Sequence, residues 1–307
     1  MVRNWIFWLL VEILIIFLVV NFYKHEIRYS DDKRISSRTA SDPDQEWRRT
    51  SDPRTLPDRL QNLDQRDPEL VEHIRRHWIE PPSAGRLHLD PKVSITRHPD
   101  FTEQGQVDAV LELLHNRRDG FFVECGAADG QLKSNSLYLE LFMNWTGLLI
   151  EADRRLFDKI RTKSRHAYLV NACLSPVAHS AIMNFTAIRD AGGLNELISE
   201  GQKDRYNIDA KVSTPIQCLP LYSILSAIGV SHVDYFSLDV EGAEIDVLKT
   251  IPFDEVRIDV VSVEKRIIGD KVGTDEKEEA VVSLLSGYGY NLTNKMRLDI
   301  MLARKDV

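Results

Sequence analysis

Small and acidic residues follow the first strongly apolar segment of the central part of the chain. Residues 121–130 read FFVECGAADG, and Phe121–Val123 predicts a buried strand that runs into a turn of low bulk. The turn combines two acids with four residues that have little or no side chain: Glu124, Gly126, Ala127, Ala128, Asp129 and Gly130. A ligand can approach such a main chain closely, and the acids favour one with positive charge or many hydroxyls. The glycine spacing differs from that of pyrophosphate-binding loops and no P-loop lysine follows, so a phosphate-rich ligand is disfavoured.

A further acid ends the next apolar run. Gly147–Ile150 predicts a second strand, and Glu151 follows it, 25 residues after Gly126. An acid at this distance from a glycine-containing turn is placed to accept both hydrogen bonds from a ribose diol. An acid at a strand end can also be merely solvated, but together with the turn it leads us to expect ribose binding. A third run, Ala167–Val170, is followed by Asn171, which we expect beside an adenine edge.

More carboxylates gather in the stretch YFSLDVEGAEIDVL. Asp239 and Glu241 follow the predicted strand Tyr235–Leu238, and Gly242 permits a tight exit into a helix. Paired carboxylates can orient a substrate, act as a general base or hold a cation. We assign Asp239 and Glu241 to catalysis and name no metal ligands. Glu244 can equally serve only as a favourable residue in the first turn of the helix.

Strands and helices alternate around these residues. A fifth apolar run covers Val256–Val263, and the stretches RRLFDKIRTK and EIDVLKTI between the runs have helical spacing. Such alternation implies right-handed crossovers and a mainly parallel sheet covered on both faces, which is an α/β fold. GYGYNLTN and DIMLARKD near the end predict a closing antiparallel hairpin. Ligands of these sheets lie beyond the carboxyl ends of the strands, where the acids fall.

Five motifs, in order along the chain, resemble those of the FkbM-type methyltransferase domain: VECGAADG, SNSLYLE, WTGLLIEAD, NACLS and FSLDVEGAEIDVL. The resemblance covers roughly residues 106–304 and implies a Rossmann-like class I methyltransferase sheet that binds S-adenosylmethionine. The positive sulfonium group of this cofactor would suit an acid-bearing turn. The chain also resembles the Star family of membrane-anchored regulators of EGF-receptor signalling, and this resemblance implies a role in vesicle-mediated transport of growth-factor precursor cargo.

The resemblance also implies roles for individual residues. Glu151 would meet the ribose of the cofactor and Asn171 the adenine. Asp239 and Glu241 would lie near the site of methyl transfer. The residues implied at the methionine end are Glu124, Gly126 and Asp129. The whole set expected to bind the cofactor is Glu124, Gly126, Ala127, Asp129, Gly130, Asn135, Glu151, Asn171 and Asp239.

The amino-terminal third has a different composition. Residues 5–23, WIFWLLVEILIIFLVVNFY, are almost continuously apolar over 19 residues, about the length that crosses a bilayer as a helix. No small-residue cleavage site follows, so we expect an uncleaved transmembrane signal anchor after a short flank, 1–4. Residues 24–66 lack apolar periodicity and predict a disordered stalk. Asp67 and Pro68 predict the start of a helix in a helical linker, 67–105, which leads into the methyltransferase-like domain, 106–307.

Charge and glycosylation signals bear on partners and location. Residues 106–307 contain 23 Lys and Arg against 30 Asp and Glu, a poor match for a phosphate backbone, so we expect no nucleic-acid partner. Basic residues after the apolar segment favour a cytoplasmic domain, whereas three N-glycosylation triplets favour a lumenal one. The triplets begin at Asn144, Asn184 and Asn291. We expect a lumenal domain in the endoplasmic reticulum, Golgi or endosome. Three cysteines leave at least one free or paired between chains.

Three functions stay open on the sequence alone. The first is a trafficking adaptor whose methyltransferase-like domain binds a cargo protein. The second is an active O-methyltransferase that acts on a glycan, a lipid or a small hydroxylated molecule, with Asp239 as the base or orienting group. The third is a structural remnant that binds neither ligand nor cargo. Neither the acceptor, the cargo nor the oligomeric state follows from the residues.

Overall fold

The computed structural model describes residues 55–91, 101–188, 192–207 and 213–307. The expected anchor at 5–23, its flank and the stalk as far as residue 54 lie outside the described residues. Among the helices that are described, none combines the length and the apolar character needed to cross a bilayer.

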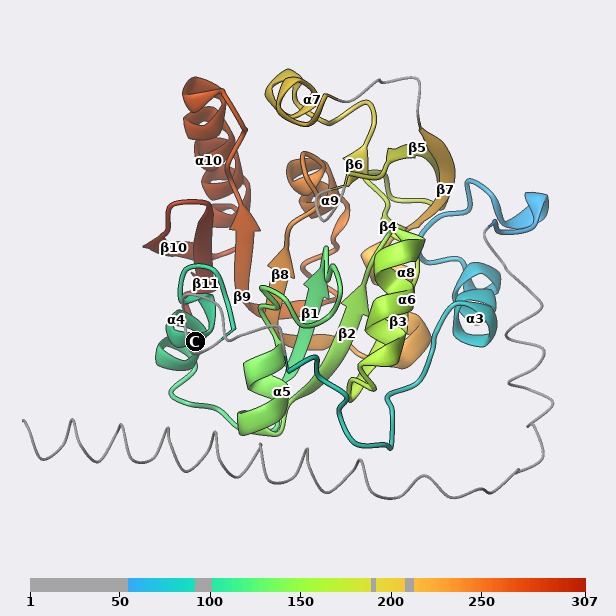
Figure 1. Cartoon of the computed structure of the whole chain (residues 1–307), viewed down its shortest axis with the longest axis horizontal. Coiled ribbons are helices and arrows are strands. Elements are labelled where there is room, and N and C mark those ends of the chain that lie inside the picture. Colours follow the sequence, from blue (N-terminus) through green and yellow to red (C-terminus); the bar gives the residue numbers. More distant parts are fainter. Residues whose placement is uncertain (1–54, 92–100, 189–191, 208–212) are drawn as a thin grey trace, which may run out of the picture. The chain divides into compact units, whose positions relative to one another are not determined.

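A seven-stranded sheet forms the centre of the domain, with the order β10-β11-β9-β8-β1-β2-β3 (Figure 1). Its strands are β1 (Phe121–Cys125), β2 (Thr146–Ile150), β3 (Ala167–Val170), β8 (His232–Leu238), β9 (Arg257–Glu264), β10 (Tyr290–Lys295) and β11 (Asp299–Arg304). The five strands from β9 to β3 pair in parallel, and β10 and β11 form an antiparallel hairpin on the β9 edge. The predicted parallel sheet and closing hairpin are therefore confirmed, as a mixed Rossmann-like sheet of the class I methyltransferase type.

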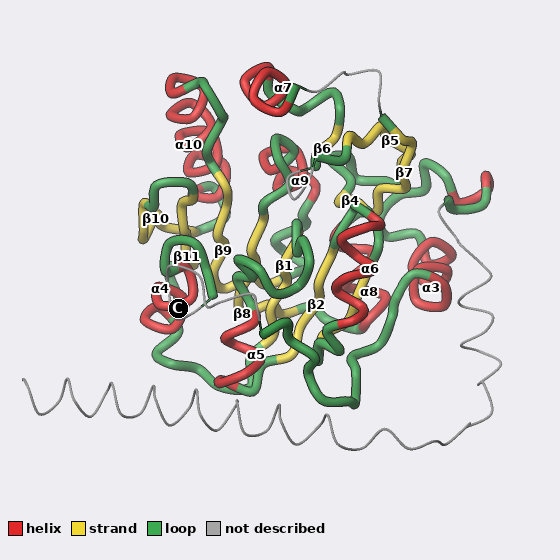
Figure 2. The backbone as a smooth tube through the Cα atoms, in the orientation of Figure 1, coloured by secondary structure: helices red, strands yellow, loops and turns green. Residues whose placement is uncertain are grey.

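Helices cover both faces of this sheet (Figure 2). One apolar cluster joins α4, α5 and α6 to side chains such as Phe122, Leu149 and Tyr235. The alternate side chains of the same strands, such as Val123 and Phe236, belong to a second cluster with α3, α8, α9 and α10. The helices are α3 (Pro68–His77), α4 (Gln106–Leu113), α5 (Leu137–Met143), α6 (Arg154–Thr162), α7 (Glu200–Tyr206), α8 (Leu221–Ile228), α9 (Glu244–Thr250) and α10 (Lys271–Ser286). This alternation of faces is what the period of two in a strand produces.

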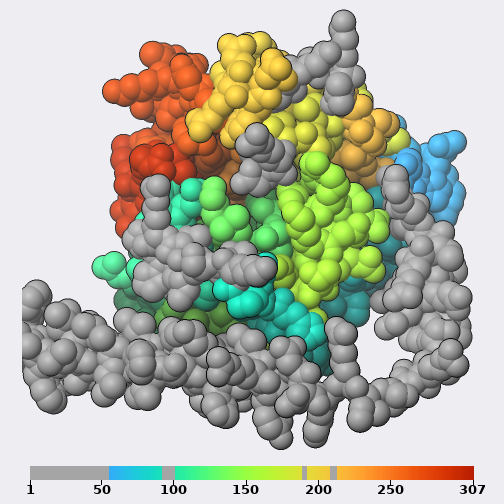
Figure 3. Space-filling model, viewed as in Figure 1, coloured from blue at the N-terminus to red at the C-terminus, as the bar shows by residue number. Residues whose placement is uncertain are grey.

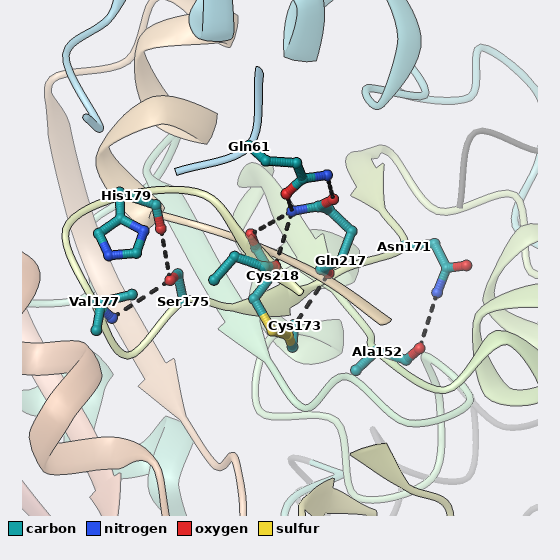
Figure 4. The surroundings of a disulfide bond; sticks show 10 residues. Gln61, Ala152, Asn171, Cys173, Ser175, Val177, His179, Gln217 and Cys218 are labelled. Atoms are coloured by element: carbon teal, nitrogen blue, oxygen red, sulfur yellow. Dashed lines mark hydrogen bonds between the residues drawn. A yellow bond between two sulfur atoms is a disulfide. The ribbon is translucent and has the colours of Figure 1, made fainter. Parts of the chain in front are cut away.

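A second, four-stranded sheet, which the sequence did not predict, has the order β4-β7-β5-β6. Its strands are β4 (Cys173–Leu174), β5 (Ala181–Thr186), β6 (Gly193–Leu194) and β7 (Thr214–Leu219). A disulfide between Cys173 and Cys218 joins the neighbouring strands β4 and β7 (Figure 4). The buried Cys125 of β1 is the free cysteine that the odd number requires.

The ordered domain begins before residue 67, which corrects the predicted end of the stalk. Leu56 and Leu60, the latter in a short 3₁₀ helix η1 (Asp58–Leu60), are 1% and 0% exposed and belong to the core. The Leu56 N–H and the Gln61 amide both donate to Oε1 of Gln217 on β7, at 3.0 and 2.9 Å (Figure 4). The next helix, α3, starts as predicted, with the Asp67 carboxylate capping its amino end. Two buried side chains of α3 also belong to the core, so this part of the expected linker packs with the domain.

Candidate functional site

Two adjoining cavities lie at the carboxyl ends of β1, β2 and β8, where ligands of such sheets bind. Their volumes are about 70 and 210 Å³, and Gly126, Asp239 and Glu241 line both of them. In Figure 1 the strands β1, β2, β8 and β9 point toward the side of the domain that carries α7, and Figure 3 shows α7 and α10 along that edge with α6 below them. The cavity of about 70 Å³ is called the inner cavity below, and that of about 210 Å³ the outer cavity.

The turn after β1 is small chiefly because another part of the chain lies against it. Gly126 has φ +79°, and a Cβ placed on it would lie 1.9 Å from the carbonyl oxygen of Asp239. The N–H of Asp239 donates in turn to the carbonyl of Cys125, so the ends of β1 and β8 are held together. Gly130 also has positive φ and faces Ile160 of α6. The glycines therefore permit close packing of this turn, and Gly126 is part of the wall of both cavities.

Glu151, directly after β2, points back toward this turn. Its carboxylate accepts hydrogen bonds from the N–H groups of Ala128 and Asp153, at 2.8 and 2.7 Å, on different oxygens. In the ionised form each oxygen keeps a second lone pair, so the carboxylate can accept two hydrogen bonds from a diol. Glu151 is 6% exposed and lines the inner cavity. Burial raises its pKa to about 8, and the two N–H donors oppose that shift only in part.

One part of the inner cavity wall is apolar, whereas Asp239 and Glu241 belong to the rest of it. Leu156, Leu174, Phe185 and Leu194 form the apolar part, an arrangement that suits the faces of a flat aromatic base. Asn171, which was predicted beside the adenine, is not among the lining residues. Its amide donates to the carbonyls of Glu151 and Ala152, at 2.8 and 3.3 Å, and so braces the end of β2 (Figure 4).

Glu124 lines the outer cavity, but its carboxylate already accepts hydrogen bonds from residues of the loop before α5. It accepts hydrogen bonds from the Asn135 N–H at 2.7 Å and the Ser134 hydroxyl at 2.9 Å, and a further one from Ser136. Burial raises the pKa of Glu124, although nearby Arg165 opposes the shift. Glu124 thus fixes the loop before α5, and the loop presents Asn135 to the cavity. The Asn135 amide nitrogen donates to Ser237, whereas its oxygen Oδ1 is buried without a hydrogen-bond partner.

The remaining predicted residues of the turn, Asp129 and Ala127, make contacts within the fold and also line the outer cavity. Asp129 accepts the N–H groups of Gln131 and Leu132, at 2.9 and 2.7 Å, and so closes its own turn. Ala127 is 2% exposed and packs into the core, although it also borders the outer cavity. Sequence reasoning missed Arg165, a fully buried residue that donates to the Gly130 carbonyl and pairs with Glu140 at 2.6 Å. A lone arginine before a strand carries no motif that would have revealed this role.

Asp239 and Glu241 come together as predicted, at the boundary between the two cavities. Burial raises the pKa of Asp239 well above its usual value, and the negative charge of Glu241 adds to the effect. Glu241 has φ +55° and accepts a hydrogen bond from Gln202 of α7; burial raises its pKa as well. Glu244 has the structural role that was left open, because it accepts the N–H groups of Val240 and Gly242 and pairs with Lys277 at 2.7 Å.

A third carboxylate, which the sequence analysis did not single out, lies beside this pair. Glu264 is the last residue of β9, the parallel neighbour of β8, and it is 6% exposed. Ligand oxygens of Asp239, Glu241 and Glu264 lie within 4.8 Å of one another. The available signal was an acid at a strand end, the same signal that revealed Glu151. The sequence pattern does not reveal the order of the strands in the sheet. It is this order, with β9 next to β8, that brings Glu264 close to Asp239.

Comparison with known proteins identifies the domain to which these motifs belong. The family model described as methyltransferase FkbM domain matches residues 124–292, more than half of the chain. No curated protein matches, so the more specific resemblance to the Star family stays a prediction.

Several solved structures are similar in fold. A human methyltransferase 10 domain containing protein is 13% identical, with a TM-score of 0.36, and the match covers 79% of this chain and 97% of that one. A precorrin-6y C5,15-methyltransferase from Geobacter metallireducens is 13% identical, with a TM-score of 0.35 and coverages of 71% and 98%. A SAM-dependent methyltransferase from Aquifex aeolicus is 9% identical, with a TM-score of 0.34 and coverages of 70% and 97%. These values are low, and the family match alone carries the assignment.

Proposed function

We propose that this chain, which belongs to the FkbM methyltransferase domain family, is a methyltransferase that uses S-adenosylmethionine to methylate a hydroxyl group. The observation that carries the proposal is Glu151, held against the turn after β1 with two free acceptor positions at the wall of the inner cavity. A ribose diol needs two such acceptors side by side. The apolar side chains of the same cavity, Leu156, Leu174, Phe185 and Leu194, suit an adenine ring, so the residues present fit the cofactor that the family implies.

The chain's own residues would contribute positioning and proton transfer. Bound S-adenosylmethionine supplies an activated methyl group, and its transfer is a direct displacement in which alignment provides most of the rate. The acceptor hydroxyl must also lose a proton. Asp239 lies between the two cavities, and its raised pKa makes it a better base near neutral pH than an ordinary aspartate. We therefore assign the base to Asp239 and the orientation of the acceptor to Glu241.

Calorimetry on the full chain tests cofactor binding. We expect micromolar affinity for S-adenosylmethionine and a loss of at least tenfold in Glu151→Ala, which corresponds to about 1.4 kcal/mol or more. Asp158→Ala removes a carboxyl group from the exposed face of α6, where Asp158 pairs with Arg154 and Arg161, and should bind normally. An absence of binding to the wild-type chain, or equal losses in both variants, would contradict the proposal.

Transfer itself is tested with the labelled methyl group of the cofactor and panels of glycans, lipids and small hydroxylated compounds. Asp239→Asn keeps the shape of the side chain but removes the base, so label transfer should fall by roughly 10²-fold or more. If the wild-type chain binds the cofactor and labels no acceptor class, the domain is a binding module.

The second proposal is the role implied by the Star resemblance, a membrane-anchored protein of the secretory pathway that acts in growth-factor trafficking. Two features support the location. The asparagines of all three glycosylation triplets are exposed, and the Cys173–Cys218 disulfide is of a kind that persists in oxidising compartments. Trafficking of cargo has no supporting contact among the described residues, and it depends on the resemblance alone.

Endoglycosidase treatment of the protein made in animal cells tests the location. A lumenal domain would carry glycans and shift in mobility on treatment, and triple substitution of Asn144, Asn184 and Asn291 by Gln would abolish the shift. An untreated chain that already runs at the mobility of the triple variant would place the domain on the cytoplasmic side.

A further inference from the structure

Two groups of acidic side chains are close enough to share a metal ion in the part of the chain that the structure describes. The first, at the amino ends of β8 and β9, consists of His232, Asp234 and Asp259. Its carboxylates already bind Arg117 and Arg257, with Asp259 at 2.8 and 2.7 Å from these two guanidinium groups. The arginines neutralise the negative charge of these carboxylates, so we do not propose a metal site there.

The second group, at the carboxyl ends of the same strands, consists of Asp239, Glu241 and Glu264. The parallel register that places Leu238 beside Val263 brings the residues that follow these two positions together. Oxygens bound to one small divalent ion at about 2.0–2.6 Å lie about 3–5 Å apart. The observed limit of 4.8 Å between ligand oxygens meets this requirement. All three residues line the outer cavity.

An independent observation also points to a ligand. Oxygen Oε2 of Glu264 is buried and has no hydrogen-bond partner, although the residue is only 6% exposed and lines the cavity. Buried carboxylate oxygens without a partner are costly, because the group has lost its water and gained nothing in exchange. The amide oxygen Oδ1 of Asn135 lines the same cavity and is likewise without a partner. Both atoms are oxygen acceptors, the atom type that hard divalent cations select.

The charged groups around this site leave an excess of negative charge. Lys277 is engaged by Glu244 at 2.7 Å, and the nearest atom of Arg266 is 3.9 Å from Oε1 of Glu264. Asp299 lines the same cavity and adds a further carboxylate, which accepts a hydrogen bond from Gln106 at 2.5 Å. Burial raises the pKa of Glu264 well above its usual value, and Asp239 and Glu241 add to the effect by repulsion. A bound cation would relieve this repulsion and displace the protons.

We propose that Asp239, Glu241 and Glu264 bind one divalent cation of the Mg²⁺, Mn²⁺ or Ca²⁺ class in the outer cavity. Three carboxylates and no nitrogen or sulfur ligand favour these ions over zinc or copper. The side of the ion that faces the cavity would remain open to water or to an oxygen-rich ligand. The site does not depend on the proposed methyl transfer, and in a chain with the ion bound Asp239 would be a ligand of the ion rather than the free base of that reaction.

Electron paramagnetic resonance of Mn²⁺ with the full chain tests the site, because the signal of the free ion disappears on binding. We expect one Mn²⁺ per chain, competition by Mg²⁺ or Ca²⁺, and at least a tenfold loss of affinity in Glu264→Gln. Glu103→Gln is the matched control. Glu103 lines the same cavity and pairs with Lys133 at 3.3 Å, outside the group of three, so its loss changes the charge of the cavity without removing a ligand.

Four results would overturn the site. The first is an absence of saturable Mn²⁺ binding at millimolar concentration, and the second is an equal loss of affinity in Glu264→Gln and Glu103→Gln, which would indicate diffuse attraction only. The third is displacement of Mn²⁺ by one equivalent of S-adenosylhomocysteine, which would assign the carboxylates to the ammonium group of the cofactor. Thermal unfolding of each variant confirms that it is folded, and retained folding with retained Mn²⁺ affinity in Glu264→Gln also rejects the site.

Discussion

Strands β8 and β9 carry acids at both ends, and the two ends treat them in opposite ways. At the amino ends, Arg117, which precedes β1, pairs with both Asp234 and Asp259. Arg257, on β9 itself, also pairs with Asp259. At the carboxyl ends, the part of the chain that the structure describes shows no comparably close pair for Asp239 or Glu264: Arg266 lies 3.9 Å from Glu264, and Lys277 pairs with Glu244. Acidic residues on the same two strands thus stabilise the fold at the amino ends, whereas at the carboxyl ends they are available to bind a ligand.

The pKa values of these acids also differ between the two ends of the strands. Burial alone would raise the pKa of Asp259, but hydrogen bonds from Arg117, His232 and Arg257 outweigh it and lower the pKa. At the other end nothing outweighs burial, and the pKa values of Asp239 and Glu264 are raised. Carboxyl groups with raised pKa values in a cavity are typical of functional sites, whereas neutralised pairs are typical of structural ones.

The largest effect is expected from the removal of Asp259, the acid that pairs with two arginines. Asp259→Ala should lower the free energy of unfolding by roughly 2–3 kcal/mol, because it leaves Arg117, Arg257 and His232 without their shared partner. The loss should be smaller than for a fully buried pair, since both arginines are 39% exposed in their side chains and solvent screens them. Denaturant unfolding measures the change. The affinity for S-adenosylmethionine, measured on the same variant, should not change, and a matching loss of affinity would mean that the two ends are not separate in function.

A second test uses pH, because the two ends should titrate in opposite senses. Asp259 has a lowered pKa, so the stability it contributes is present above its unfolded value of about 4 and is lost as the pH falls through the folded value. Asp239 and Glu264 have raised pKa values, so their contribution is complete below about 4 and is lost as the pH rises through the folded values. Each group that titrates changes the free energy of unfolding by up to about 1.4 kcal/mol per pH unit.

Unfolding measured from pH 3 to 9 in two variants separates these contributions. Asp259→Asn should flatten the acid limb of the stability profile, and Glu264→Gln should flatten the alkaline limb. The comparison fails if either variant changes both limbs equally.

The smallest expected effect is the change in the free energy of unfolding caused by Glu264→Gln near neutral pH. Glutamine keeps the shape of the side chain and removes a carboxyl group that gains no hydrogen bond at Oε2, so the free energy of unfolding should stay the same or rise by up to about 1 kcal/mol. Denaturant unfolding without added metal measures it beside Asp259→Ala. A destabilisation as large as that of Asp259→Ala would show that Glu264 is structural.

The sequence predicted the central sheet well, because its signals are local. The strands β1, β2, β3, β8 and β9 fall on the apolar runs, and the hairpin of β10 and β11 falls on the last two. The small second sheet was missed because two of its strands are only two residues long and its pairings join distant parts of the chain. No periodic pattern forms over so short a span.

The candidate site was predictable in part, for a similar reason. Acids and glycines at strand ends identified Glu151 and Asp239, whose positions depend on one strand each. The hydrogen bonds that occupy Glu124 and Asn171 depend on loops that no pattern describes. Glu264 could have been suspected, but its distance from Asp239 follows from the pairing of β8 with β9.

The Cys173–Cys218 bond has a practical consequence for the choice of expression host. Cys173 lines the inner cavity, so the bond belongs to the wall that we assign to the nucleoside. A bacterial cytosol would keep both thiols reduced and leave β4 and β7 without their covalent link. Protein purified from such cells can misfold at this wall and give a false negative in a ligand-binding assay. Secretion from animal cells or export to a bacterial periplasm would supply material on which a negative result is informative.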